Sequence, residues 1–295
     1  MQSQCNELCR ANMRFEAIDR ISIPSPTSAI NEDAVGATNN VAWVIDGATG
    51  VSDLPPLVPD LTDAAWLTMQ LNEGLHAAFD RGAVDLPAAL AKIDTDLRAQ
   101  FGRINQLQER SPIEQPTAAF ALSVLAGDAV HLIGLGDCRV VVENGIGEVH
   151  EFDPSERGHA EALIIQERAR LVAAYSDEDP WPRLKPFIRS LRQFVNVEGG
   201  YSIVHPTLSW HSRVKRQVYN AQTVRHLLAV SDGLYRLVDV FKALTPDQLL
   251  RRAVQDGLAL LCSELRAREI ADERCVIYPR VKTYDDASAA LIRFS

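Results

Sequence analysis

The stretch VAWVIDGATG, residues 41–50, is among the most informative in the chain, because its apolar run leads directly into an Asp-Gly pair. The same arrangement recurs in HLLAVSDGLY, residues 226–235. A buried strand that ends in Asp-Gly places a carboxylate and a closely packed backbone at one edge of a sheet. A single Asp-Gly pair is more typical of a tight turn. The interpretation therefore depends on what accompanies the two pairs elsewhere in the chain.

Two further acidic pairs stand beside predicted strands. Glu32 and Asp33 precede the first strand, and Asp285 and Asp286 open the apolar run ASAALIRF. Four acidic clusters far apart in sequence, each next to a strand, indicate one shared centre. Carboxylates are hard oxygen ligands that suit Mg²⁺ or Mn²⁺, whereas zinc or copper would favour His and Cys. Two such ions can activate a water molecule and hold a phosphoryl group.

Length and composition are those of an ordinary globular protein. The chain has 295 residues, 46% hydrophobic and 23% charged, with a net charge of −9. This acidic balance argues against general nucleic-acid binding and against adhesion to acidic membranes. No apolar run approaches the roughly 18 residues of a membrane helix, and the N-terminus lacks a secretory signal, so we expect a cytoplasmic location. The five cysteines show neither a disulfide framework nor zinc-site spacing.

Apolar periodicity predicts strands and helices without strict β-α-β alternation, which fits an α+β sandwich better than a parallel doubly wound sheet. Strands are expected at about 13–23, 41–45, 117–125, 130–134, 139–143, 201–205, 216–219, 227–230 and 287–294. Helices are expected at about 61–80, 86–107, 156–175, 183–195 and 245–267. No internal repeat or convincing linker is present, which favours one domain.

The order of the acidic motifs resembles that of a known family. The motifs are NEDA at 31–34, DGATG at 46–50, GDCR at 136–139, SDG at 231–233 and DDAS at 285–288. Over about residues 14–294 the chain is similar to the metal-dependent, type 2C protein phosphatases of the PPM family. The resemblance implies one domain over 1–295, a four-layer α-β-β-α sandwich with two central antiparallel sheets, and a diverged flap-like insertion at about 153–225. It also implies that metal-bound water hydrolyses phosphoserine or phosphothreonine in proteins.

The same resemblance implies that two Mg²⁺ or Mn²⁺ ions bind to the acids described above. Asp46 would bridge both ions, and the carbonyl oxygen of Gly47 would bind one of them. Asp232 and Asp285 would bind the other ion. Asp46, Asp232 and Asp285 would thus be the catalytic residues.

The remaining acids would support this centre. Glu32 and Asp33 would act through water, and Asp286, where the family commonly has Asn, would hold the ligands in place. Asp137 matches an acid that contributes to a third metal site in some members. The partner acid of that third site is replaced here by Arg236, which argues against a third ion.

Two family residues that handle the phosphate are missing from this chain. Ala48 stands where many members have a His thought to protonate the leaving oxygen. Ser28 stands where many members have a phosphate-binding Arg. Loss of a bidentate cation would ordinarily weaken phosphate binding.

A basic segment offers a replacement for the missing cation. Between residues 183 and 225 the chain carries eight Lys or Arg residues and a single acid. We expect Arg213, Lys215 or Arg216, together with Arg236, to recruit the phosphorylated substrate; a solvated basic surface is the alternative. The helical spacing over 183–195 would leave the basic side chains of that helix toward solvent.

Two other functions stay open. A catalytically weak or silent member could keep the fold as a phosphoprotein-binding regulatory module, which Ala48 and Ser28 favour. The retained acids argue against it, because clustered carboxylates repel one another unless a cation neutralises them. A phosphatase for a small phosphomonoester is the third reading, since the same metals could serve it. The sequence names neither the physiological substrate nor the oligomeric state.

Overall fold

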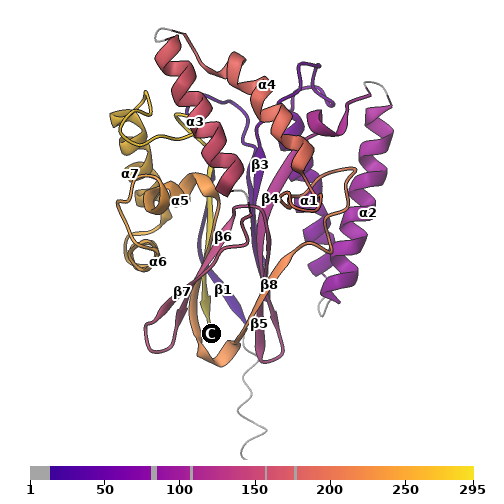
Figure 1. Cartoon of the computed structure of the whole chain (residues 1–295). Helices are drawn as coiled ribbons and strands as arrows, with labels where there is room; N and C mark the ends of the chain where they lie inside the picture. Colours follow the sequence, from indigo (N-terminus) through magenta and orange to yellow (C-terminus); the bar gives the residue numbers. More distant parts are fainter. Residues whose placement is uncertain (1–13, 81–84, 107–108, 157, 176–177) are drawn as a thin grey trace, which may run out of the picture.

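Two five-stranded sheets form the centre of the molecule, with helices on both outer faces (Figure 1). The computed structural model describes residues 14–80, 85–106, 109–156, 158–175 and 178–295. Its strands are β1 (Phe15–Ile23), β2 (Ala34–Ala37), β3 (Val41–Ala48), β4 (Thr117–Ala126), β5 (Ala129–Leu135), β6 (Arg139–Asn144), β7 (Val149–Phe152), β8 (Lys215–Asn220), β9 (Val224–Val230) and β10 (Ala287–Phe294). Its α-helices are α1 (Asp63–Phe79), α2 (Leu86–Asn105), α3 (Gly158–Ala174), α4 (Trp181–Leu191), α5 (Asp232–Asp239), α6 (Pro246–Asp256) and α7 (Leu258–Ala271).

The sheet topology confirms the predicted architecture. One sheet has the order β1-β10-β9-β6-β7, and the other has the order β2-β3-β4-β5-β8. Every strand pairing in them is antiparallel. Helices α1 and α2 cover the second sheet, while α5, α6 and α7 cover the first (Figure 1). The chain therefore folds as an α+β sandwich with two central antiparallel sheets.

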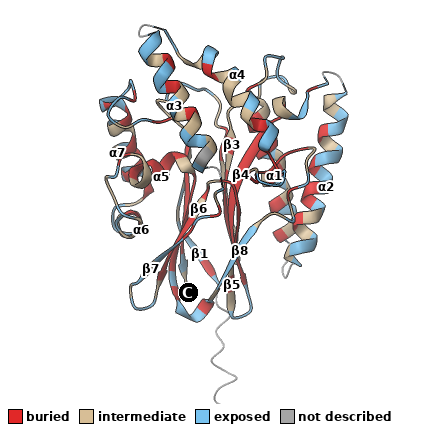
Figure 2. Ribbon diagram, viewed as in Figure 1, coloured by how far each residue is buried: buried red, intermediate tan, exposed pale blue. Residues whose placement is uncertain are grey.

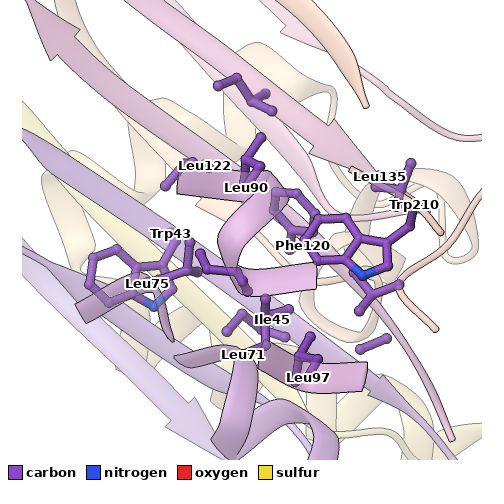
Figure 3. Packing of buried hydrophobic residues seen from close by; sticks show 14 of the residues in the cluster. Trp43, Ile45, Leu71, Leu75, Leu90, Leu97, Phe120, Leu122, Leu135 and Trp210 are labelled. Atoms are coloured by element: carbon purple, nitrogen blue, oxygen red, sulfur yellow. The ribbon is translucent and has the colours of Figure 1, made fainter. Parts of the chain in front are cut away.

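Apolar side chains fill the layers on either side of the central strands, which are buried, whereas the outer strands β1, β7 and β8 are largely intermediate or exposed (Figure 2). Strand β3 contributes to two of these layers because its residues alternate in direction. Trp43 and Ile45 face α1 and α2 (Figure 3), whereas Ala42 and Val44 face the other sheet. The buried indole of Trp43 donates a hydrogen bond to Asn72 Oδ1 at 2.8 Å. This packing holds the end of β3, and with it Asp46, in a fixed position.

Several predicted elements have different bounds in the structure. Residues 201–205 form only isolated bridges, and the single helix expected at 245–267 is two helices that meet at Gly257, where φ is +83°. The capping box of Thr245 and Gln248 confirms the expected start of that region. Strands β2 and β7 and helix α5 were not expected. The predicted limits at Met13 and Leu107 lie outside the described residues.

Helices α3 and α4 belong to neither outer layer. They follow β7 and lie above one end of both sheets, across the ends of the central strands (Figure 1). This is the segment that the sequence predicts to be a flap-like insertion. Across the described ranges, we find no helix with the length and apolar character that a bilayer crossing requires.

Candidate metal centre

The predicted acids gather at the end of the sheets that lies beneath α3 and α4. Asp46 lies near the end of β3, and Asp137 lies in the turn between β5 and β6. Asp232 begins α5 directly after β9, and Asp285 lies just before β10. These four side chains line one cavity of about 200 Å³, which we call the acidic cavity. The topology thus brings together acids separated by up to 239 positions in sequence.

Close backbone approach explains why Gly follows both Asp46 and Asp232. The N–H of Gly47 donates to the carbonyl oxygen of Glu32 at 3.1 Å. A Cβ added at Gly47 would lie 2.4 Å from that same oxygen, and one added at Gly233 would lie 1.8 Å from the carbonyl oxygen of Asp286. Any side chain at either position would force the backbone apart. Each Asp-Gly pair is therefore packed directly against one of the other two acid pairs.

Asp286 joins two distant segments of the chain at the same place. Its Oδ1 accepts a hydrogen bond from the backbone N–H of Ser25 at 2.7 Å, and its Oδ2 accepts one from the N–H of Glu32 at 2.6 Å. Glu32 in turn accepts a hydrogen bond from Thr49 Oγ1 at 2.8 Å. Asp286 therefore acts through the backbone, by positioning Glu32 and the loop before it.

The electrostatics of the cluster favour a bound cation. Burial, followed by repulsion from Asp232 and Asp33, raises the pKa of Asp46 well above its ordinary value. Burial, followed by repulsion from Asp286 and Asp285, does the same to the pKa of Asp33. The pKa of Asp232 rises to about 7, again chiefly because the group is buried. Buried acids this close cannot all be ionised unless a positive charge neutralises them.

Asp285 differs from the other acids because two basic side chains hold it. Its Oδ1 accepts a hydrogen bond from Lys282 Nζ at 2.8 Å, and its Oδ2 accepts one from Arg236 Nη2 at 2.6 Å. Although burial opposes ionisation, Lys282 and Arg236 hold the pKa of Asp285 below its ordinary value. In the other direction, burial lowers the pKa of Lys282, but the nearby carboxylates, chiefly that of Asp285, raise it above its ordinary value. Asp285 is therefore ionised and already paired.

The donor set of the cluster consists of oxygen atoms, as a hard divalent cation requires. Asp33 Oδ2 is buried without a hydrogen-bond partner in the described part of the chain. A buried oxygen of this kind is suited to interact with a cation. The oxygen ligands also match the preference of Mg²⁺ and Mn²⁺. Within the described ranges, however, no three His, Cys, Asp or Glu side chains are already grouped as a set of ligands. Ligation by Asp285 would require its two ion pairs to loosen.

The walls of the acidic cavity combine apolar and basic side chains. Helices α3 and α4 cover it from above and supply its apolar lining: Ile164, Trp181, Ile188 and Leu191. An adjoining pocket of about 550 Å³, which we call the side pocket, shares Trp181, Lys282 and Asp285 with it. Ser28, Glu32 and Asp286 line the side pocket as well. Both hollows therefore meet at Lys282 and Asp285.

Basic side chains fix α4 over the cavity, and the expectation that they face solvent is wrong. Lys185 and Arg189 both form ion pairs with Asp53, and Arg189 Nε donates to the carbonyl oxygen of Val51 at 2.8 Å. Hydrogen bonds from Lys185 and Arg189 lower the pKa of Asp53 to about 2. Arg192 is only 6% exposed and donates to two backbone carbonyl oxygens. The polar side of this helix is thus bound to the loop that follows Asp46.

The basic residues expected to recruit substrate lie in different places. Arg236 lines the acidic cavity but is 7% exposed and paired with Glu269 at 3.0 Å as well as with Asp285. Neither Arg213 nor Arg216 is among the described residues that line the acidic cavity or the side pocket. Lys282, which does line both, was not singled out from the sequence. Its only signal there is a Lys three positions before an acid pair.

The structure thus combines an α+β sandwich of two antiparallel sheets with acidic side chains that line a cavity at one end of the sheets. A family profile described as Protein phosphatase 2C matches residues 27–272. The chain therefore belongs to the protein phosphatase 2C family. A search of curated proteins gave no match.

Solved structures show the same fold. The catalytic domain of the serine/threonine protein phosphatase PstP, in complex with two manganese ions, matches with a TM-score of 0.56 at 16% identity, over 96% of this chain and 99% of that one. PstP/Ppp from Mycobacterium tuberculosis matches with a TM-score of 0.55 at 15% identity, over 95% and 98%. Stp1 from Staphylococcus aureus matches with a TM-score of 0.54 at 14% identity, over 96% and 94%. At these identities the likeness is one of fold.

Proposed function

We propose that this protein is a metal-dependent phosphatase that hydrolyses phosphoserine and phosphothreonine in proteins with the help of two Mg²⁺ or Mn²⁺ ions. The observation that carries the proposal is the cluster of buried acids in the acidic cavity and next to it. Its raised pKa values mark carboxylates that need a cation, and the membership in the phosphatase family supplies the reaction class. Phosphorylated proteins are the proposed partners, and we propose no nucleic-acid or membrane partner.

The chain's own residues would divide the work as follows. Asp46 and the carbonyl oxygen of Gly47 would hold the ions on the β3 side, and Asp232 would hold one from the start of α5. Glu32 and Asp33 would hold water molecules of the centre. Bound divalent ions supply a nucleophilic water at neutral pH and neutralise charge on the phosphoryl group. The apolar side chains of α3 and α4 would exclude bulk water and so strengthen these interactions.

Three details of the proposal follow from particular residues. Arg236 stands beside the acids where a third ion would need a carboxylate, so we propose two ions and not three, with Asp137 in a supporting role. Ala48 offers no proton, so the leaving oxygen would take its proton from water. We also keep the proposal of one domain over 1–295, in which the segment at about 153–225 covers the centre.

The test combines substrates, metals and one substitution. We expect hydrolysis of para-nitrophenyl phosphate and of a phosphoserine or phosphothreonine peptide in the presence of Mn²⁺ or Mg²⁺, and none with a chelator. Asp232→Asn should abolish it, because the amide cannot neutralise the ion. Asp96→Asn, which alters an exposed acid of α2, is the matched control. Turnover that resists the chelator or the Asp232 substitution would contradict the proposal.

A second function is favoured by one observation. Lys282 and Arg236 occupy both oxygens of Asp285, which is what a silent member that has exchanged an ion for basic side chains would show. Such a regulatory module would bind a phosphopeptide tightly and turn over no substrate with any metal. The small-phosphomonoester reading predicts turnover of small esters alone, and the cover of α3 and α4 over the cavity is compatible with it. The same assay separates all three.

A further inference from the structure

A phosphate dianion that enters an acidic cavity needs a basic partner as well as metal ions. Among the described residues, five basic side chains line the acidic cavity: Arg139, Arg192, Arg236, Arg280 and Lys282. They differ in how many protein acceptors each already has and in how much of each side chain is exposed. These two properties decide which of them can bind a ligand.

The four arginines are occupied. Arg139 contacts three carboxylates at 3.0 to 3.3 Å, and Arg236 lies between two carboxylates. Arg280 donates to a carboxylate of Asp272 and to several backbone carbonyl oxygens. Arg192 is 6% exposed and also donates to backbone carbonyl oxygens. Moving Arg192, Arg236 or Arg280 toward a ligand would leave buried acceptors unpaired, which is costly. Moving Arg139 would break three ion pairs.

Lys282 is placed differently. Its side chain is 28% exposed, against 14% for Arg139 and 7% for Arg236. An ammonium group carries three donors, and the ion pair with Asp285 at 2.8 Å takes one of them. Lys282 is also the one basic residue, among those described, that lines both the acidic cavity and the side pocket.

The surroundings of Lys282 hold its ammonium group in place. Arg236 binds the second oxygen of Asp285 at 2.6 Å, so the carboxylate that holds Lys282 is itself fixed. Arg280 Nε donates to the carbonyl oxygen of Thr283 at 3.1 Å and Arg280 Nη1 donates to that of Tyr278 at 3.0 Å, which braces the loop on both sides of Lys282. A donor fixed before the ligand arrives loses little entropy on binding.

We propose that Lys282 is the phosphate-binding residue of this site, and that Asp285 positions it rather than serving mainly as a metal ligand. The proposal rests on the phosphatase function proposed above. The ligand is the phosphoryl group of a monoester, or the inorganic phosphate that hydrolysis releases. Lys282 would bind a phosphoryl oxygen that reaches the boundary between the two hollows, in the cavity that Asp46 and Asp232 also line. It would thereby replace the cation that Ser28 cannot provide in the side pocket.

A rival role for Lys282 predicts a different result. If Lys282 only neutralises Asp285, its removal changes how tightly metal ions bind but leaves phosphate binding intact once the metal sites are full. The decisive measurement is therefore the affinity for inorganic phosphate at saturating Mn²⁺, by isothermal titration calorimetry. Metal saturation is verified for each variant by a separate Mn²⁺ titration.

The experiment compares wild type with Lys282→Met, Lys282→Arg and the control Lys92→Met. Lys92 forms a lysine–aspartate pair of the same 2.8 Å length, on the exposed surface of α2. We expect Lys282→Met to weaken phosphate binding by about ten- to a hundredfold and to raise KM for para-nitrophenyl phosphate, since a charge-assisted hydrogen bond is lost. Lys282→Arg should retain most of the binding, and Lys92→Met should match wild type.

The outcomes separate this inference from the proposed function. Phosphate affinity of Lys282→Met within about twofold of wild type at saturating Mn²⁺ would overturn the role of Lys282. Wild-type protein that binds no phosphate would overturn it as well. Phosphate binding that depends on Lys282 in a protein that hydrolyses nothing would support the inference and refute the phosphatase. If Lys282→Met does not fold, as judged by thermal melting, Lys282→Gln takes its place in the same comparison.

Discussion

His205 gives the molecule a defined loss of stability in acid. Its imidazole is only 1% exposed. The Nε2 atom lies 3.0 Å from the carbonyl oxygen of Pro112, and Nδ1 accepts hydrogen bonds from the backbone N–H groups of Thr207 and Leu208, each at 3.1 Å. A ring that donates at Nε2 and accepts at Nδ1 is neutral. Burial, reinforced by the charge of Arg192, lowers the pKa of His205 to about 4.

The size of this loss of stability follows from the difference between the pKa of His205 in the folded protein and in the unfolded chain. In the unfolded chain the imidazole takes up a proton below its ordinary pKa of about 6.5, whereas in the folded protein it stays neutral until about pH 4. The unfolded state therefore binds more protons across this window, and stability falls as the pH is lowered through it. A difference of about 2.5 pKa units corresponds to about 3 kcal/mol.

The assay is urea denaturation of wild type and His205→Gln at pH 7 and at pH 4.5. Wild type should be the more stable at pH 7, because glutamine cannot reproduce all three hydrogen bonds. The advantage should shrink by about 2 kcal/mol at pH 4.5, since only wild type carries the proton-linked penalty. Other titrating groups contribute equally to both proteins and cancel. A stability difference between the two proteins that is the same at both pH values would show that protonation of His205 does not destabilise the folded protein.

Four further outcomes are expected. Gly233→Ala places a methyl group 1.8 Å from the carbonyl oxygen of Asp286, and Mn²⁺ affinity measured by calorimetry should fall by about ten- to a hundredfold. Gly50→Ala, where an added Cβ has no heavy atom within 4 Å, should leave that affinity unchanged, and a similar loss in both variants would contradict the packing argument. Arg236→Met removes a buried cation from two carboxylates, so the free energy of unfolding in urea should fall by about 3 kcal/mol; an unchanged value would show that the pairs contribute nothing net. Asp53→Asn removes the carboxylate that anchors α4, and trypsin should then cleave within α4 faster than in wild type; equal digestion rates would argue that other contacts hold the helix.

The positions of the acids were predictable because each follows or precedes a strand with a clear apolar run. Asp232 follows β9 and Asp285 precedes β10, so the antiparallel pairing of these two strands brings both acids to one end of the first sheet. Asp46 ends an apolar run in the second sheet, and it joins them because the two sheets pack face to face. The short β2 was not predictable, since four residues carry too little periodicity. Helix α5 was not recognised in the sequence, because it begins at Asp232, almost directly after the end of β9.

Pairings between basic and acidic side chains could not be predicted, because they depend on which loops the fold brings together. Arg192 occupies a polar position of a helical pattern, yet the loop after β3 lies against it and buries it. Arg236 occupies the place of a family acid, and nothing local indicates that Asp285 lies opposite. The break at Gly257, where φ is +83°, could not be predicted either, because the apolar pattern continues through it. There the N–H of Leu258 donates to Asp19 Oδ2 of the distant strand β1 at 2.8 Å.

The hydrogen bonds of Asp286 set when, during synthesis, the acidic centre can exist. Asp286 holds residues 25 and 32, and the strand that follows it pairs with β1 and β9 inside the first sheet. These contacts span more than 250 positions, so they form only after the segment that carries Asp286 has been synthesised. A nascent chain lacks the strand that carries Asp285 and Asp286 up to the cluster. The acidic cluster is therefore incomplete until β10 has been made and paired with β1 and β9.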